Sequence, residues 1–310
     1  MRAIMIHEYG NPEVLVEQET DLPICSDTQV LVELYATSVN PVDGNIRAGL
    51  VQEVFPVHRF PHVLGLDIAG VVRNIGAAVT QFKPGDRVFG LSSSGSYAEY
   101  AAAEEAQLAK LSDRVSIIEA GALPAVALTA WDSLFRYGEL KQGERVLIHG
   151  GAGGVGHVAI QMAKLSGAYV IATARAVNHD FVRGLGADEV IDYTAVDYSE
   201  AVSGIDMVLD FIVGLDQAKN GKVLREGGRI VSIVTPAIAD IAGSYGVDGR
   251  FVVVEPNRVK LEQIEGWVKE RKLQVHLSDT LPLSEAALRQ AHTQIETKHT
   301  KGKIAIQIRE

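Results

Sequence analysis

The chain has 310 residues, of which 47% are hydrophobic and 22% charged, and its net charge is −10. This length and composition predict a folded protein of about two domains, and acidic residues spread along the chain argue against nucleic acids and membrane surfaces as partners. No stretch is typical of a membrane span or a secretory signal. The single cysteine, Cys25, excludes an intramolecular disulfide and a multi-cysteine zinc site, so we expect a cytoplasmic protein.

The first 118 residues predict a β-rich domain. Residues 30–36 (VLVELYA) form an apolar, β-branched run that predicts a strand. Turns rich in glycine and proline separate it from further short β-rich runs at 69–72, 87–89 and 97–101. Many short strands of this kind favour a small barrel-like domain.

The pattern changes at about residue 116. Residues 117–135 are rich in alanine and leucine and predict a helix that is interrupted near Pro124. From residue 145 onward, strands and helices alternate, which predicts a parallel, doubly wound sheet. The expected strands are 145–149, 169–174, 189–191, 206–212, 229–234 and 251–254, and the expected helices are 155–166, 178–185 and 215–225.

The last part of the chain contributes a helix and a strand. The helix is expected after Pro256 and ends at about Glu270, and residues 303–308 (KIAIQI) alternate as a half-buried strand does. Because the doubly wound sheet is complete before this strand, we expect the strand to return to the first domain. The predicted organisation is one domain of residues 1–118 and 272–310, and a second of residues 119–271.

Residues 145–167 carry the strongest functional signal. An apolar run predicts a buried strand, a glycine-rich turn follows, and a helical pattern ends at Gly167. Gly151, Gly153 and Gly156 match G-x-G-x-x-G, in which the glycines serve the tight turn, the approach of a pyrophosphate and close helix packing. A tight turn in an ordinary α/β protein is the alternative, but the flanking strand and helix favour a dinucleotide site. The expected contacts around the helix N-terminus are Gly151, Ala152, Gly153, Gly154 and Val155.

The end of the second strand indicates which dinucleotide binds. An NAD site places Asp or Glu about 20 residues past the fingerprint, on the ribose 2′-hydroxyl. Here Arg175 stands in that region, and no carboxylate follows before Asp180. Since a guanidinium binds a 2′-phosphate and a carboxylate repels it, the sequence predicts NADPH, unless Arg175 is only a solvated surface cation. The expected contacts are Thr173, Ala174, Arg175, His179 and Tyr193.

Further cofactor contacts follow from the topology of a doubly wound sheet. Ligands of such sheets lie outside the carboxyl ends of the strands. The expected fourth and fifth strands end next to short apolar segments, which should flank the ribose and the nicotinamide. These residues are Phe211, Ile212, Val213, Ile233 and Val234.

Several motifs occur in an order that resembles one family. They are residues 39–43 (VNPVD), 64–70 (LGLDIAG), 85–90 (GDRVFG), 95–100 (GSYAEY), 128–130 (LTA), the glycine turn, 185–188 (LGAD), 191–193 (IDY) and 302–304 (GKI). Together they resemble the medium-chain dehydrogenase/reductase superfamily and, within it, the zinc-free quinone oxidoreductase-like branch. The resemblance covers nearly the whole chain.

The resemblance implies an α/β protein with a GroES-like β-rich catalytic domain, a Rossmann domain with a doubly wound parallel sheet, and an active site in the cleft between them. It implies an enzyme, usually a homodimer, that uses NADPH to reduce a quinone or an α,β-unsaturated carbonyl. It also places Thr129 at the nicotinamide, although a helix threonine often bonds only to its own backbone.

The metal ligands of zinc-dependent relatives are missing from this chain. Those relatives carry a cysteine near residues 40–42 and a His-Glu pair after the glycine at Gly65, where residues 66–67 are Leu-Asp. His58 and His62 are close in sequence, but they have no thiolate or glutamate partner to complete a tetrahedral site. We therefore expect no bound metal, which argues against a zinc-dependent alcohol dehydrogenase.

Without a metal, the oxygen that gains charge during hydride transfer needs hydrogen-bond donors. The candidates are Asn40 and Asn45 as amide donors, Arg47 as a cation, and Asp43 as a group that orients its neighbours; a plain turn at residues 40–43 is the alternative. Many quinone oxidoreductases carry a tyrosine where Asn45 stands. The alternatives to quinone reduction are therefore an enoyl or enone reductase without quinone activity, or a non-catalytic NADPH-binding protein.

Overall fold

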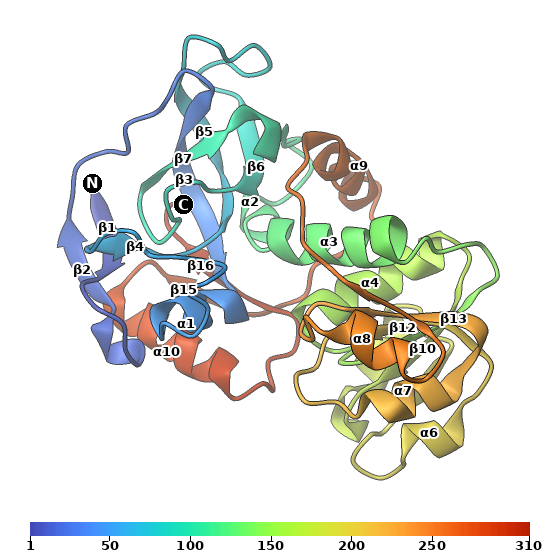
Figure 1. The fold of residues 1–310 in the computed structure, drawn as a ribbon. Coiled ribbons are helices and arrows are strands. Elements are labelled where there is room, and N and C mark those ends of the chain that lie inside the picture. Colours follow the sequence, from blue (N-terminus) through green and yellow to red (C-terminus); the bar gives the residue numbers. More distant parts are fainter. The chain divides into compact units, whose positions relative to one another are not determined.

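The structure is a computed structural model and describes residues 1–310. The chain divides into two units (Figure 1). Unit 1 comprises Met1–Ala125, Pro256–Arg271 and Val275–Glu310, and unit 2 comprises Val126–Glu255 and Lys272–Gln274. None of the helices combines the length and the apolar character that crossing a membrane requires.

Unit 1 consists mainly of antiparallel strands. Its larger sheet has the order β15-β16-β3-β5-β6-β8, with β7 also paired to β3, and a smaller sheet has the order β2-β1-β4. The strands are β1 (Arg2–Ile6), β2 (Val16–Glu19), β3 (Gln29–Val39), β4 (His62–Val63), β5 (Asp67–Ile75), β6 (Arg87–Leu91), β7 (Tyr100–Glu104), β8 (Leu108–Lys110), β15 (Leu277–Pro282) and β16 (Lys303–Gln307).

The long strand β3 forms because its apolar residues alternate. Val30, Val32 and Leu34 are fully buried in one core cluster of unit 1, as the period of two requires. The strand expected at 97–101 begins only at Tyr100, because Tyr97 lies in the preceding turn and donates its N–H to the carbonyl of Leu64. Sequence periodicity located this strand but not its start.

The C-terminal strand β16 pairs antiparallel with β3, with Ile304 opposite Val39 and Ile306 opposite Thr37 (Figure 1). The expectation that the last strand returns to the first domain is therefore confirmed. This pairing brings Lys303, the first residue of β16, to the end of β3, where the candidate residues 40–47 begin.

The helices of unit 1 are α1 (Pro41–Arg47), α2 (Ile117–Ala120), α9 (Arg258–Lys269) and α10 (Glu285–Glu296), with short 3-10 turns at η1 (Pro12–Val14) and η2 (Glu105–Gln107). The sequence reading missed α10, which Ser284 caps by accepting the N–H of Ala287. The predicted boundaries put α9 in the second domain, whereas it packs with unit 1, where Ser112 donates its N–H to the Glu265 carboxylate at 3.0 Å.

Unit 2 is a parallel sheet of order β11-β10-β9-β12-β13-β14. The first strand of the unit, β9, is central, so the strand order reverses beside it, as in a doubly wound fold. The elements are β9 (Arg145–Ile148), β10 (Tyr169–Thr173), β11 (Glu189–Ile191), β12 (Ile205–Asp210), β13 (Leu224–Ser232), β14 (Asp248–Phe251), most of α3 (Pro124–Trp131), η3 (Asp132–Tyr137), α4 (Gly154–Leu165), η4 (Ala176–Asn178), α5 (His179–Gly184), α6 (Tyr198–Ala201), α7 (Gln217–Val223) and α8 (Ile238–Gly243).

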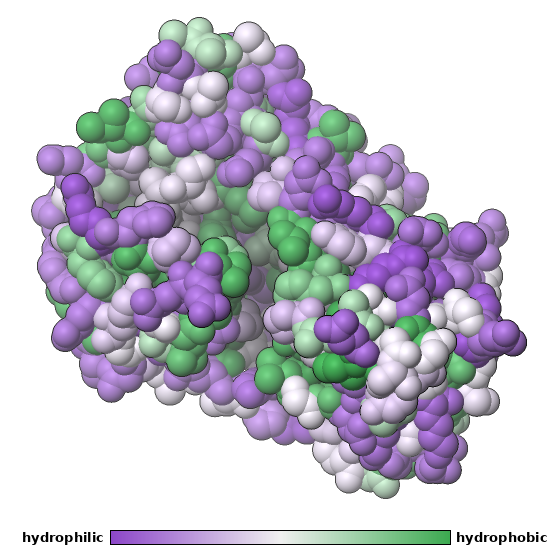
Figure 2. Space-filling view, viewed as in Figure 1, coloured by the Kyte–Doolittle hydropathy of each residue, from purple (hydrophilic) through white to green (hydrophobic).

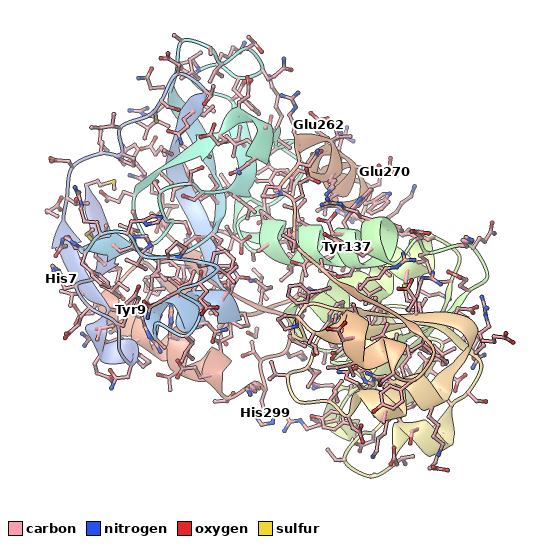
Figure 3. The ribbon with its side chains drawn as sticks, in the orientation of Figure 1. His7, Tyr9, Tyr137, Glu262, Glu270 and His299 are labelled. Carbon is pink, nitrogen blue, oxygen red and sulfur yellow. The ribbon has the colours of Figure 1, made fainter.

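The expected helix at 117–135 is three separate elements, α2, α3 and η3. Pro124 begins α3, because proline is tolerated in the first turn of a helix. The π-helical segment η3 ends at Tyr137, which is labelled in Figure 3. Its hydroxyl lies 3.4 Å from both the carbonyl oxygen and the nitrogen of Val253. This contact ties the end of η3 to the segment after β14.

Polar residues cover most of the face drawn in Figure 2, and hydrophobic residues there form smaller groups. The large exposed hydrophobic side chains include Leu50, Val54 and Phe55 after α1. Ile212 and Val213, after β12, are also exposed. The second pair follows the carboxyl end of a central strand, where a doubly wound sheet binds its ligands.

Candidate functional site

The glycine turn of unit 2 joins β9 to α4. Gly150 has φ +70°, so the tight turn that we expected to depend on Gly151 depends on Gly150 instead. Gly151 is required for another reason, since a Cβ on it would lie 2.9 Å from the Cβ of Ala172. Its N–H donates to the carbonyl of Thr173 at 3.0 Å, which holds the turn against β10.

The other two glycines have the geometry that a dinucleotide loop needs. A Cβ on Gly156 would lie 2.2 Å from the carbonyl oxygen of Gly150, so only glycine lets α4 pack this closely. A Cβ on Gly153 would meet only that same oxygen, at 3.3 Å, and no side chain caps α4 there. The first N–H groups of α4, including those of Gly154 and Val155, are therefore uncapped by a side chain, and together with the helix dipole they suit an anion.

Two residues predicted to contact the cofactor at the end of β10, Thr173 and Ala174, are buried beside the glycine turn and form hydrogen bonds within the protein. Thr173 is buried, and its hydroxyl accepts the N–H of Gly150 at 3.2 Å and lies 3.3 Å from Nδ1 of His149. Ala174 is also buried and donates its N–H to the carbonyl of Ile191 at 3.0 Å. The Thr173 hydroxyl is thus already used by the loop, and Ala152 is likewise buried.

Arg175 follows β10 and is half-buried. Its guanidinium makes no hydrogen bond and no ion pair, in contrast to Arg183 of α5, which pairs with Asp180 at 3.7 Å. Close to it, Nε2 of His179 lies 3.2 Å from the carbonyl of Ala174, and Tyr193 is 51% exposed. The cation predicted to bind a 2′-phosphate is therefore free to do so.

The sequence reading missed a carboxylate in this region. Asp192, at the end of β11, accepts hydrogen bonds from the hydroxyl of Thr194 at 2.6 Å and from its N–H at 2.9 Å. These bonds, with further help from the Ala176 N–H and the nearby His179, lower the pKa of Asp192. The sequence prediction considered only the region up to Asp180, whereas Asp192 follows the neighbouring parallel strand β11. The motif at 191–193 was the available signal.

Apolar side chains flank the carboxyl ends of the next two strands. Ile212 and Val213 are 41% and 67% exposed, while Phe211, Ile233 and Val234 are half-buried. A Cβ on Gly150 would lie 2.7 Å from Cδ1 of Ile212, so this side chain covers the glycine turn. Exposed apolar groups at this edge suit contact with a flat ring.

A buried polar network lies behind the same edge. Nε2 of His149 contacts Oδ1 of Asn220 at 2.9 Å, and Asn220 donates to Gln217, which donates to Asp210 at 2.9 Å. Ser232, at the end of β13, donates to the same carboxylate at 2.9 Å. Burial lowers the pKa of His149, which favours the neutral ring. The network therefore joins the ends of β9, β12 and β13 to α7.

The expected nicotinamide contact on α3, Thr129, is half-buried. Its carbonyl accepts the hydroxyl of Ser133 at 2.7 Å. A role for this residue at the cofactor stays a prediction.

In unit 1 the candidate acceptor residues lie at and in α1. Asn40 caps the helix, Pro41 opens it, and Oδ2 of Asp43 accepts the N–H of Asn40 at 2.8 Å. Asp43 and Arg47 are four residues apart and are buried on the same face, whereas Asn45 is exposed. Tyr9, labelled in Figure 3, packs at the end of this helix, because a Cβ on Gly49 would lie 3.0 Å from its ring.

A chain of hydrogen bonds runs from Arg47 to Asp43 and has a single direction. Arg47 can only donate, so Nδ1 of His292 accepts its bond at 3.2 Å. Burial, reinforced by the charge of Arg47, lowers the pKa of His292 to about 3, so the ring is neutral and carries its proton on Nε2. Nε2 donates to the Tyr97 hydroxyl at 3.1 Å, and that hydroxyl donates to Oδ2 of Asp43 at 3.0 Å.

The two charged residues of α1 are thus held inside unit 1. Arg47 is 2% exposed and also donates to the carbonyl of Gly10 at 3.0 Å and to Glu296 at 2.6 Å. Oδ1 of Asp43 has no hydrogen-bond partner, and burial raises the pKa of this residue to about 7, against the opposing effect of the Asn40 and Tyr97 bonds. Arg47 has no donor directed at solvent, which fits a structural role better than that of a substrate cation.

Comparisons with known proteins agree with this arrangement. Residues 26–113 match the alcohol dehydrogenase GroES-like domain family, and residues 185–306 match the zinc-binding dehydrogenase family. The chain is 34% identical to a chloroplastic quinone-oxidoreductase homolog of Spinacia oleracea, with 99% of the chain and 98% of the relative covered. The chain belongs to the quinone oxidoreductase-like branch of the medium-chain dehydrogenase/reductase superfamily.

Two further comparisons extend this result. A chloroplastic NADPH-dependent alkenal/one oxidoreductase of Arabidopsis thaliana is 33% identical, with 99% of the chain and 79% of the relative covered. The solved structure of the quinone oxidoreductase from Coxiella burnetii has a TM-score of 0.94 and 34% identity, with 100% and 99% of the two chains covered. Unit 1 is accordingly the GroES-like part of an oxidoreductase, and unit 2 has the NAD(P)-binding dehydrogenase fold.

The end of β3 and the start of β5 carry a charged cluster in unit 1. The structure contains no group of three His, Cys, Asp or Glu side chains arranged to hold a metal ion. Instead, the ammonium of Lys303 lies 3.6 Å from Oδ2 of Asp67 and 2.5 Å from Oδ1 of Asn40. A buried protein cation therefore stands between Asn40 and Asp67.

Proposed function

We propose that the protein is an NADPH-dependent, zinc-independent oxidoreductase that transfers hydride to a quinone or an α,β-unsaturated carbonyl. The observation that carries this proposal is the pair of anion sites in unit 2. The uncapped N-terminus of α4 suits a diphosphate, and the unpaired guanidinium of Arg175 suits a 2′-phosphate. The names of the two relatives described above support both acceptor classes.

Different residues of unit 2 would contact different parts of the cofactor. The N–H groups of residues 153–155 would bind the diphosphate, and Arg175, His179 and Tyr193 would surround the 2′-phosphate. The apolar residues after β12 and β13, together with Thr129, would flank the nicotinamide. When bound, NADPH supplies a hydride; an enone that accepts it and takes a proton from water becomes the saturated ketone, and a quinone becomes the hydroquinone.

The acceptor would be bound by unit 1. Hydride addition places negative charge on the acceptor oxygen, and amide N–H groups of Asn40 and Asn45 are the donors that we propose for it. A second candidate function, an enone reductase without quinone activity, is favoured by one observation. Asn45 is exposed at the position where many quinone oxidoreductases have a tyrosine, so an aromatic ring that would stack on a quinone is missing there.

The decisive experiment is NADPH oxidation with a panel of quinones and enones, run in parallel with NADH and with metal analysis of the same sample. We expect acceptor-dependent oxidation with NADPH preferred. Turnover of enones alone would select the second candidate. Tight NADPH binding without oxidation across the panel would select the non-catalytic alternative, and stoichiometric zinc would contradict zinc independence.

We also propose that the protein is a cytoplasmic homodimer. β14 is an edge strand of the unit 2 sheet and has no partner strand on its outer side. Its outer backbone N–H and C=O groups could therefore pair with a strand of a second copy. Sedimentation of the purified protein tests this, and a monomer at micromolar concentration would contradict it. The spinach relative is chloroplastic, so fractionation of the native cells decides the compartment.

A further inference from the structure

Lys303 is a buried lysine whose ammonium lies against Asn40. Its side chain is 3% exposed, and Nζ donates to Oδ1 of Asn40 at 2.5 Å and to the carbonyl of Val39 at 3.2 Å. An isolated ammonium in such a position is strongly unfavourable, so it must be paired and fully hydrogen-bonded. The cation is therefore held at one place, the end of β3 where α1 begins.

Asp67 supplies the compensating charge. It is fully buried, its Oδ2 lies 3.6 Å from Nζ of Lys303, and its Oδ1 accepts the N–H of Ala125 at 2.6 Å. Oδ2 also accepts the Ser38 hydroxyl at 2.5 Å and Nδ2 of Asn40 at 2.8 Å. The Asn40 amide thus lies between a cation, on its oxygen, and an anion, on its nitrogen.

These two charges fix which way the amide faces. If the Asn40 amide were rotated by half a turn, its oxygen would face the Asp67 carboxylate and its NH2 group would face the Lys303 ammonium. Both contacts would be repulsive, because an ammonium has only donors and a carboxylate only acceptors. The observed orientation leaves Asn40 with one further N–H on Nδ2, and this N–H has no acceptor in the structure.

We propose that Lys303 and Asp67 are positioning residues that set the Asn40 amide as the hydrogen-bond donor for the acceptor oxygen; this inference rests on the proposed function. They act in two ways. They hold the amide in one orientation, so no binding energy is spent on ordering it. The ammonium on Oδ1 also withdraws electron density from the amide, which strengthens the remaining N–H as a donor.

A double-mutant cycle tests whether Lys303 acts through Asn40. We would measure kcat and KM for an enone, and the Kd for NADPH, in wild type, Lys303→Gln, Asn40→Ala and the double variant. We expect Lys303→Gln to lower kcat/KM for the enone about tenfold, the effect of one impaired hydrogen bond, with the Kd for NADPH unchanged. In the Asn40→Ala background the same substitution should change kcat/KM less than twofold. Equal effects in both backgrounds would overturn the inference.

A second measurement is independent of turnover and covers the case that Lys303→Gln unfolds. With 15N-labelled asparagine, the side-chain NH2 signals of Asn40 are identified by their loss in Asn40→Asp. We expect these signals to move more in Lys303→Met, which removes the cation, than in Lys303→Arg, which keeps it, and not to move in Lys110→Gln, which removes an exposed lysine paired with Asp86 in the same unit. Equal movement in Lys303→Met and Lys303→Arg would refute the positioning role. Absence of acceptor-dependent oxidation in wild type would instead refute the proposed function, whatever the spectra show.

Discussion

The proposed preference for NADPH over NADH depends mainly on one side chain, Arg175. Its guanidinium is half-buried and unpaired, so a bound 2′-phosphate would gain a charge-assisted interaction without breaking an existing one. Hydrogen bonds to charged groups contribute about 1.5–3 kcal/mol, which is roughly a 10- to 150-fold change in Kd. Because the side chain is partly exposed, screening by salt favours the lower part of this range. We expect Arg175→Ala to weaken NADPH binding about tenfold to thirtyfold.

The assay is a fluorescence titration of NADPH and NADH at two ionic strengths. The Kd for NADH should change less than twofold in Arg175→Ala, because NADH has no 2′-phosphate, and the difference between the variants should shrink as salt is raised. Arg183→Ala is the matched control, since it removes an arginine of α5 that is already paired with Asp180. An unchanged ratio of NADPH to NADH affinity in Arg175→Ala, or an equal change in Arg183→Ala, would refute the assignment.

Four other predictions follow from the site. Asp192→Asn should tighten NADPH binding by about two- to tenfold, since it removes a carboxylate beside the proposed 2′-phosphate site; weaker NADH binding instead would show that Asp192 holds the ribose hydroxyls. Gly156→Ala should lower the free energy of unfolding of unit 2 by about 1–3 kcal/mol in urea and weaken cofactor binding, because its Cβ would lie 2.2 Å from the Gly150 oxygen. The control is Gly184→Ala, whose Cβ would meet nothing within 4 Å. This control should change the free energy of unfolding by less than about 0.5 kcal/mol, as is usual for such sites. Tyr97→Phe should lower the free energy of unfolding by about 1–3 kcal/mol, as it leaves Nε2–H of His292 without an acceptor. The pKa of Asp43 is raised from 3.8 to about 7 by burial, so between these pH values the folded protein keeps a proton that the unfolded chain releases. The stability that this proton contributes is therefore complete below about pH 4 and is lost as pH rises through 7. Asp43→Asn should therefore show a smaller loss of stability between pH 4 and 8, and an unchanged pH profile would show that Asp43 is ionised throughout.

The cofactor half of the protein could be predicted from sequence because its signals are local. Most strands of unit 2 contain a short apolar run, and the glycine turn lies within a few residues of the strand and helix that define it. The bounds predicted for the edge strand were wrong, because β14 is Asp248–Phe251 and the apolar run at 251–254 begins only at its last residue. The exact role of each glycine could not be predicted. A Cβ on Gly150 would meet Ile212, which follows β12, and a Cβ on Gly151 would meet Ala172 of β10, so the space at each glycine is set by residues distant in sequence.

The polar clusters of unit 1 could not be predicted, because their members are far apart in the chain. Tyr97 and His292 are separated by 195 residues, and Asn40 and Lys303 by 263. Residue type was also misleading there. Charged residues are usually exposed, and a sequence alone does not show which of them have buried partners. The sequence therefore predicts Arg47 as a substrate cation, although its contacts with Gly10, His292 and Glu296 hold it inside the fold.

The geometry of α1 separates two roles that the sequence had assigned to one segment. Positions four apart share a face of a helix, so Asp43 and Arg47 both point into unit 1, whereas Asn45, two positions from each, must point away. The buried pair joins α1 to α10 through Tyr97 and His292, and so fixes the helix rather than the acceptor. In the proposed function the acceptor meets this helix at its N-cap residue, Asn40, and on its exposed face, which includes Asn45. Asn40 is held by Lys303 and Asp67, so we predict that Asn45 is the position at which the choice between quinone and enone can change without disturbing the fold.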